Sequence, residues 1–90
     1  MAVIDIRRRH GMDLPSARAA VERVASGLAE RHGLAWQWHG DRLEFQRSGA
    51  EGSISVEPDE LHVHIRLGFP ASLLTTSIQD EIERRFANLA

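Results

Sequence analysis

Alternation of apolar and polar residues dominates the middle of the chain, from Leu34 to Leu67. Apolar residues recur at every second position in several short runs, which is the period of a strand with one buried face. Turn-forming sequences separate the runs, namely Gly40-Asp41, the glycine-bounded loop Ser48–Gly52, and Pro58-Asp59. The pattern predicts four strands joined as an antiparallel meander, with one apolar face and one face in water.

A similar alternation marks the start of the chain, where Ile4 and Ile6 lie within the segment Ala2–Arg8. This segment predicts one more strand. Proximity along the chain favours a place beside the second strand, whereas the excess of antiparallel pairs in proteins favours a place beside the fifth. We prefer the fifth.

The segment after this strand has the three- and four-residue spacing of a helix with one buried side. We predict that the helix starts after an N-cap at Asp13, ends near His32 and is followed by Gly33 at the C′ position. Gly27 inside it costs about 1 kcal/mol relative to alanine, and we expect close approach to the sheet as its compensation. The predicted buried stripe is Leu14, Ala17, Val21, Val24 and Leu28.

A second helix is predicted from about Ala71 to Asn88, after the last strand. Its first turn is expected to be separate, because Ser77 and Asp80 resemble a capping box inside the segment. Glu81 and Arg85 form an i,i+4 pair in the favourable order. The predicted buried stripe is Leu74, Ile78, Ile82, Phe86 and Leu89.

The predicted order of elements is β-α-β-β-β-β-α. Two amphipathic helices and one apolar sheet face indicate an α+β fold, a two-layer sandwich with a mainly antiparallel sheet and both helices on one face. The length of 90 residues suits a single domain, residues 1–90. Trp36 and Trp38 are in phase with Leu34, so we place both rings in the core.

The charge and composition of the chain exclude several classes of function. The net charge is −2, all eleven basic residues are arginine, and there is no cysteine. A slightly negative protein without lysine is not expected to bind nucleic acid. The lack of cysteine excludes disulfides, thiolate metal sites and a cysteine nucleophile, and it suits the cytoplasm. No apolar run is long enough for a membrane span.

The sequence contains no recognisable catalytic motif, so we predict no catalytic residue and no cofactor. His62 and His64 are the most suggestive local pair, since two imidazoles on one strand face can bind a metal. A zinc site needs three or four ligands, and only these two must be close, so we predict no metal site. A small metal-dependent protein or enzyme that uses the two histidines is the alternative.

The polar face of the predicted sheet is the candidate interaction surface. Its arginines and histidines donate hydrogen bonds and can meet carboxylates or another chain. A solvated face without a partner is the simpler interpretation, and the sheet edges and the basic end Arg7–His10 are further candidate contacts. The candidate surface consists of Arg7, Arg42, Glu44, His62, His64 and Arg66.

Short segments along nearly the whole chain share their order and spacing with a known family. They are the Ile4-x-Ile6 strand, His10 followed by Leu14 and Ala17-Arg18, Trp38–Phe45, Gly49-x-x-Gly52-x-Ile54-x-Val56 and Val63-x-Ile65-x-Leu67-Gly68. In these segments the chain resembles the polyhydroxyalkanoic acid system family, small bacterial proteins linked to storage polyester metabolism. The resemblance implies a gene context near polyhydroxyalkanoate synthesis, depolymerisation or granule proteins, and it implies no established reaction.

We therefore expect a non-enzymatic accessory or binding protein of the polyhydroxyalkanoate system. The expected location is cytoplasmic, with granule association implied by the resemblance. The expected partners are polyhydroxyalkanoate granule proteins or further copies of the chain.

Overall fold

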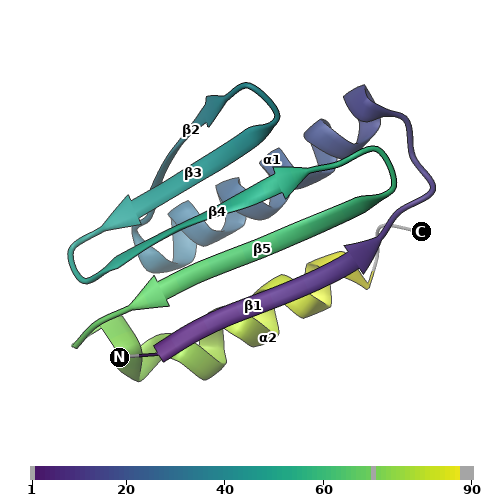
Figure 1. Cartoon of the computed structure of the whole chain (residues 1–90). Helices are drawn as coiled ribbons and strands as arrows, with labels where there is room; N and C mark the ends of the chain where they lie inside the picture. The colour runs from purple at the N-terminus through teal and green to yellow at the C-terminus, as the bar shows by residue number, and fades with distance from the viewer. Residues whose placement is uncertain (1, 70, 88–90) are drawn as a thin grey trace.

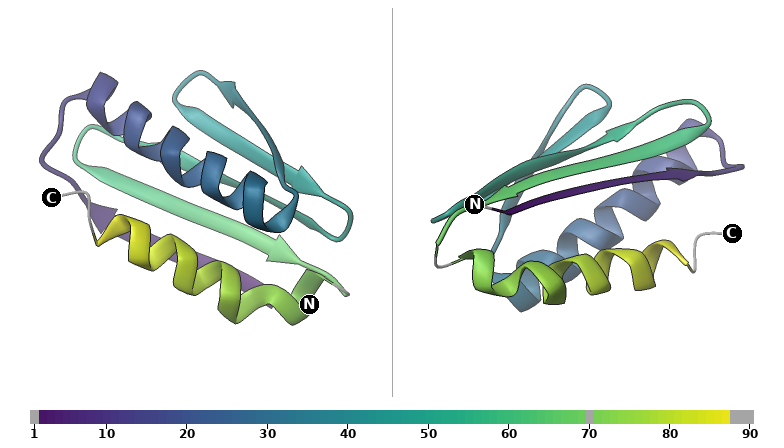
Figure 2. Two further views of the ribbon diagram at one scale, coloured as in Figure 1. Left: turned by 180° about the vertical axis from the view of Figure 1, so that it is seen from behind. Right: turned by 60° about the horizontal axis from the view of Figure 1, so that its bottom comes forward.

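The computed structural model describes residues 2–69 and 71–87 and has the predicted order of elements (Figure 1). One antiparallel sheet in the order β1-β5-β4-β3-β2 forms one layer, and the helices cover one of its faces (Figure 2). The α+β prediction is confirmed. The strands are β1 (Ala2–Arg9), β2 (Ala35–His39), β3 (Arg42–Arg47), β4 (Ala50–Val56) and β5 (Glu60–Leu67); the helices are α1 (Leu14–His32), the 3-10 helix η1 (Ala71–Leu74) and α2 (Thr75–Phe86).

Strand β1 lies at one edge of the sheet beside β5, as we preferred, with Ile4 opposite Ile65. Strand β2 forms the other edge. The meander β2 to β5 is paired in simple succession through tight turns. The first strand of the chain therefore completes a sheet whose other strands are consecutive.

The core lies between the sheet and the two helices. It takes every second residue of the strands and the facing sides of both helices, in agreement with the predicted alternation. Trp36 and Trp38 are on this side of the sheet but are half-buried, packing against the margin of the core and not inside it. The largest fully buried side chains are Ile4, Leu28, Leu43, Ile54, Leu61, Ile65, Leu67, Ile78, Ile82, Val21, Val24 and Val63.

Helix α1 begins and ends as predicted. The Asp13 carboxylate accepts a hydrogen bond from the Ser16 amide at 2.9 Å, and Gly33 adopts a left-handed conformation with φ of 69°. Within the stripe, Leu14 is only partly buried. The predicted role of Gly27 is wrong, because a Cβ atom at this position would meet the guanidinium of Arg85 on α2, not the sheet.

Glu81 is the buried charged residue of the described chain, with 4% of its surface exposed. Its carboxylate lies between the helices, 2.6 Å from Arg85 Nε and 3.3 Å from Arg31 Nε. Burial by itself would raise the pKa of Glu81, but the hydrogen bond from Arg85 and the charge of Arg31 outweigh it and lower the pKa. The predicted i,i+4 pair is thus part of the contact between α1 and α2.

Two boundaries differ from the prediction. Strand β4 starts at Ala50, so the loop Ser48–Gly52 shrinks to a two-residue turn in which Gly49 has a φ of 82°. Register is the reason, because pairing of Arg47 with Ala50 extends both strands to the turn. At the C-terminal end, the separate first turn is confirmed as η1, while α2 starts at Thr75, ahead of the suggested capping box. The predicted Asn88 and Leu89 lie outside the described residues.

Candidate functional site

The face of the sheet that the helices leave uncovered, here termed the open face, carries side chains in three rows that cross all five strands. Neighbours in each row are paired directly across adjacent strands, so their side chains are within reach of one another. The structure places all six residues of the predicted surface in these rows. The rows are Val3-Arg66-Glu51-Gln46-Ala35, Asp5-His64-Ser53-Glu44-Gln37 and Arg7-His62-Ser55-Arg42-His39.

The three arginines of these rows have acidic partners. Arg42 lies 3.3 Å from Glu44, Arg66 pairs with Glu51 across β5 and β4, and Arg7 lies 3.0 Å from Glu60. Exposed ion pairs of this kind contribute about 0–1 kcal/mol each to stability. Their main effect is to balance the charge, so the open face offers both cations and carboxylates to a partner.

Asp5 on β1 contacts both histidines of β5. One carboxylate oxygen lies 3.0 Å from His62 Nε2, and the other lies 3.4 Å from His64 Nδ1. The hydrogen bonds from His62 and His64 hold the pKa of Asp5 below its usual value. Among residues 2–69 and 71–87, no group of three or more His, Cys, Asp or Glu side chains is placed to hold a metal ion.

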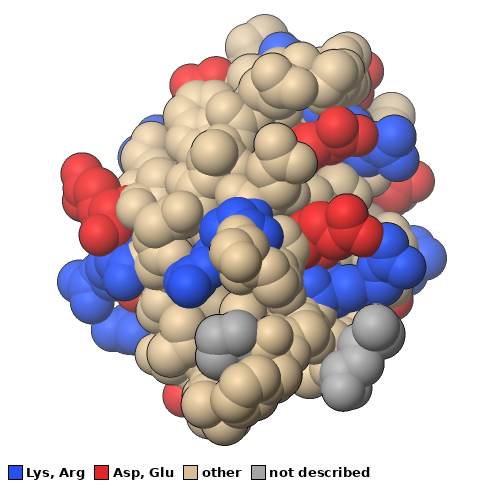
Figure 3. Space-filling model, turned by 90° about the vertical axis from the view of Figure 1, so that its left-hand side faces the viewer, with Lys and Arg blue, Asp and Glu red and all other residues tan. Residues whose placement is uncertain are grey.

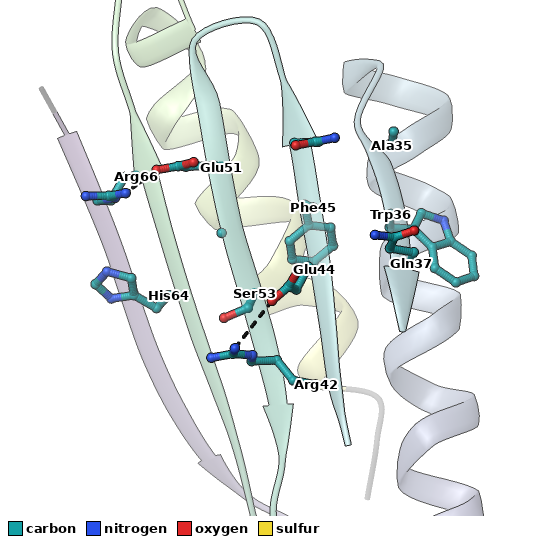
Figure 4. Close-up of a pocket in the computed structure, with 12 residues that line it drawn as sticks. Ala35, Trp36, Gln37, Arg42, Glu44, Phe45, Glu51, Ser53, His64 and Arg66 are labelled. Carbon is teal, nitrogen blue, oxygen red and sulfur yellow. Dashed lines mark hydrogen bonds and ion pairs between the residues drawn. The ribbon is translucent and has the colours of Figure 1, made fainter. Parts of the chain in front are cut away.

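A shallow groove of about 520 Å³ runs over β2 to β5 on the open face (Figure 4). It brings together four of the six predicted residues, whereas Arg7 and His62 lie outside it. Figure 4 shows Arg42 and Glu44 directed toward each other, with Ser53 beside them. The groove is lined by Ala35, Trp36, Gln37, Arg42, Glu44, Phe45, Gln46, Glu51, Gly52, Ser53, His64 and Arg66.

The family resemblance noted in the sequence is confirmed by comparison with protein families. The model of the family described as "Putative polyhydroxyalkanoic acid system protein" matches residues 4–89. The chain belongs to this family. No curated protein and no solved structure matches it. Family membership links the chain to the polyhydroxyalkanoic acid system.

Several residues of the open face escaped the sequence prediction. Glu51 fell in the supposed loop and was not assigned to a strand at all. Asp5 lies between the apolar residues Ile4 and Ile6 of β1, but its partners could be recognised only once β1 was known to pair with β5. Gln37 and Ser53 carried no signal beyond alternation.

No helix among the described residues is long and apolar enough to cross a membrane.

Proposed function

We propose that this protein is a non-enzymatic accessory protein of the polyhydroxyalkanoate system that binds a protein partner through the groove on the open face. Family membership supports the association with the polyhydroxyalkanoate system. The observation that carries the binding role is the groove itself, which collects polar side chains from four strands over about 520 Å³. This volume falls in the range of small-molecule pockets, roughly 300–1,000 Å³, but the groove lies open on the sheet surface, which favours a segment of another protein over an enclosed small molecule.

The charged groups of the groove favour recognition over catalysis. The side chains of Arg42 and Glu44 are 56% and 40% exposed, so water screens their charges. General acid–base catalysis depends on groups whose pKa values are tuned by burial or by a dry electrostatic environment. Solvated ion pairs lack that environment, but they can exchange their internal partners for those of another protein.

The mixture of groups in the groove indicates the chemistry of the partner. Arginine offers donors only, the carboxylate of Glu44 offers acceptors only, and the amide of Gln37 offers both. A protein segment that carries both carboxylates and cations satisfies such a surface. We propose a polyhydroxyalkanoate granule protein as this partner, which would give the chain a granule-associated location in the cytoplasm.

Affinity capture from polymer-accumulating cells tests this function. Tagged protein would be recovered under mild conditions and its partners quantified by mass spectrometry. The double variant Arg42→Ser with His64→Ser removes two groove side chains without touching the core. We expect about a tenfold loss of the main partner, corresponding to about 1.4 kcal/mol of binding free energy.

Arg23→Ser on the solvent side of α1 is the matched control and should capture the partner as the wild type does. Granule proteins that co-purify with the wild type and the control, but not with the groove variant, would support the proposal. Equal capture by all three proteins, with the fold intact, would contradict it.

A further inference from the structure

Three large apolar side chains of the described chain remain exposed, and they gather at one end of the molecule. Val3, Phe69 and Leu73 are 53%, 80% and 75% exposed. Val3 lies near the start of β1, opposite Arg66 near the end of β5, and Phe69 comes two residues after that strand. Figures 1 and 2 show η1, which contains Leu73, beside the start of β1. We term Val3, Phe69 and Leu73 the apolar tip.

The backbone around the tip is held firmly, so the exposure of its side chains is built into the fold. The Gly68 amide donates to the Gly49 carbonyl at 2.6 Å, and the Ser72 amide donates to the Gly68 carbonyl at 3.0 Å. The Thr75 hydroxyl donates to the Ser72 carbonyl at 2.7 Å. Ala71 between Phe69 and Leu73 is buried. The turn thus fixes Ala71 inward and leaves its two large apolar neighbours in water.

Two arginines lie at the same end of the molecule as the tip, Arg66 on the open face and Arg47 on the opposite side of the sheet. Arg66 is paired across the strands with Val3, and Arg47 precedes the turn whose Gly49 touches Gly68. Arg66 shares its charge with Glu51, and Arg47 donates to the His32 carbonyl, but each guanidinium has five N–H donors and retains some for a ligand. Figure 3 shows this end of the molecule, where uncharged residues extend from top to bottom, with basic atoms near the middle and charged groups on both sides.

We propose that the apolar tip rests on the surface of the storage polyester itself, with Arg47 and Arg66 directed at its oxygen atoms. A polyhydroxyalkanoate surface presents alkyl groups, ester carbonyls that only accept hydrogen bonds, and carboxylates at chain ends. Apolar side chains with donor-only guanidinium groups nearby complement all three. The choice of polyester as the ligand depends on the proposed function, whereas the exposed apolar tip is a feature of the structure.

The size of the tip argues for a bulk surface over a second copy of the chain. A stable interface buries about 800 Å² on each partner, whereas one aromatic side chain buries roughly 150–250 Å² and the tip has one aromatic and two aliphatic residues. Binding to a polymer surface requires no shape complementarity, because the transfer of apolar side chains from water into any apolar phase lowers their free energy. Weak, reversible attachment is the expected mode.

Sedimentation with protein-free, amorphous poly(3-hydroxybutyrate) particles tests the inference. The wild type should pellet with the particles. The double variant Phe69→Ser with Leu73→Ser should bind about tenfold more weakly, and Val3→Thr, which keeps the β-branched shape, should show a smaller loss. Circular dichroism and thermal unfolding would verify that the variants fold, as expected for side chains that are mostly exposed.

The groove variant Arg42→Ser with His64→Ser separates this inference from the proposed function. The groove variant should lose binding to the protein partner and still bind the polymer. The tip variant should lose binding to the polymer and still bind the purified protein partner. Failure of the wild type to bind the particles, or equal binding by the tip variant, would overturn the inference. Stronger binding to phosphatidylglycerol–phosphatidylethanolamine vesicles than to polymer would overturn it in favour of lipid. A dimer in light scattering that the tip variant dissociates would overturn it in favour of a second copy.

Discussion

Gly52 lies within β4 on the core side of the sheet, between Phe45 and Ile65. A Cβ atom there would lie 2.4 Å from the His64 carbonyl oxygen and 2.7 Å from the Ile65 Cα atom. These are backbone atoms, so relief of the clash requires β4 and β5 to separate locally. We expect Gly52→Ala to lower the free energy of unfolding by about 2–3 kcal/mol, as measured by urea denaturation.

Gly11→Ala is the matched control for this prediction. A Cβ atom at Gly11 has nothing within 4 Å, so its effect should be within about 0.5 kcal/mol. Similar unfolding free energies for the two variants would show that the strands do not approach as closely at Gly52 as described.

Gly27 allows the Arg85 side chain to lie across α1. A Cβ atom would lie 2.5 Å from Arg85 Cζ, so Gly27→Ala must displace the guanidinium from Glu81. The substitution gains about 1 kcal/mol of helix propensity and loses a charged hydrogen bond of about 1.5–3 kcal/mol. We expect a net destabilisation of about 1 kcal/mol.

The effect of Gly27→Ala on stability should change sign in the Arg85→Ala background. There the substitution is expected to stabilise the protein by about 1 kcal/mol. Urea denaturation of the four proteins in this double-mutant cycle measures the coupling. Purely additive effects would mean that Arg85 moves aside without cost.

Sequence reasoning at the residue scale succeeded where alternation alone decides the outcome. It assigned the core and open faces of the strands because each side chain points opposite to its neighbours. It failed where an environment depends on a distant element. The surroundings of Gly27 and Glu81 are set by the packing of α1 against α2, and Gly52 was assigned to a loop because a close approach of strands leaves no signal other than glycine itself.

At the scale of elements, α1 is attached to the β2–β3 hairpin by a set of polar contacts around Trp38. Its indole Nε1 donates to Glu22 at 2.6 Å, and the Arg18 guanidinium lies 3.9 Å from the centre of the ring. Arg18 also donates to the Gly40 carbonyl at 2.7 Å and pairs with Asp41. The half-buried ring therefore links helix and hairpin from the margin of the core.

Removal of this ring should weaken the attachment. We expect Trp38→Ala to lower the free energy of unfolding by about 2–3 kcal/mol, less than the roughly 3–5 kcal/mol of a fully buried aromatic residue. Trp38→Phe keeps an aromatic face for Arg18 but removes the hydrogen bond to Glu22, so it should cost about 1 kcal/mol. A loss below about 1 kcal/mol for the alanine variant in urea denaturation would contradict the proposed link.

The elements themselves were largely predictable, because strands, helix caps and the separate turn before α2 depend on local pattern. The candidate groove was only half predictable. Alternation placed Arg42, Glu44, His64 and Arg66 on one face, but the order of the strands determined which of the six residues meet in the groove. The apolar tip left no sequence signal, since Phe69 and Leu73 look like ordinary core residues until the turn fixes their direction.

At the scale of the whole molecule, three carboxyl groups of the described residues have pKa values below their usual range. Hydrogen bonds from His62 and His64 lower that of Asp5, and the Ser16 contacts lower that of Asp13. For Glu81, the arginines outweigh the opposing effect of burial. A lowered folded-state pKa contributes stability above the unfolded-state value, and this stability is lost as the pH falls through the folded-state value. The protein should therefore be destabilised by acid.

Comparison of wild type with Glu81→Gln isolates one of these groups. Above pH 4.5, the ordinary pKa of a glutamate, the wild type should be the more stable, because only the ionised carboxylate attracts Arg31 and Arg85. The difference should shrink as acid protonates Glu81 and makes the two side chains alike. Urea denaturation at pH values above and below 4.5 measures the difference in unfolding free energy between the two proteins. A difference that stays constant with pH would contradict a lowered pKa of Glu81.

The place of β1 at the edge beside β5 affects how the chain reaches its native state. Strand β1 is synthesised before β5, the strand that pairs with it, which is completed only at Leu67. Pairing between distant segments is slow, and an unpaired strand can meanwhile join a strand of another chain. Charged side chains discourage such encounters, and Arg7, Arg8 and Arg9 make up the end of β1. We expect this arginine run to protect the nascent strand from aggregation until β5 is available to pair with it.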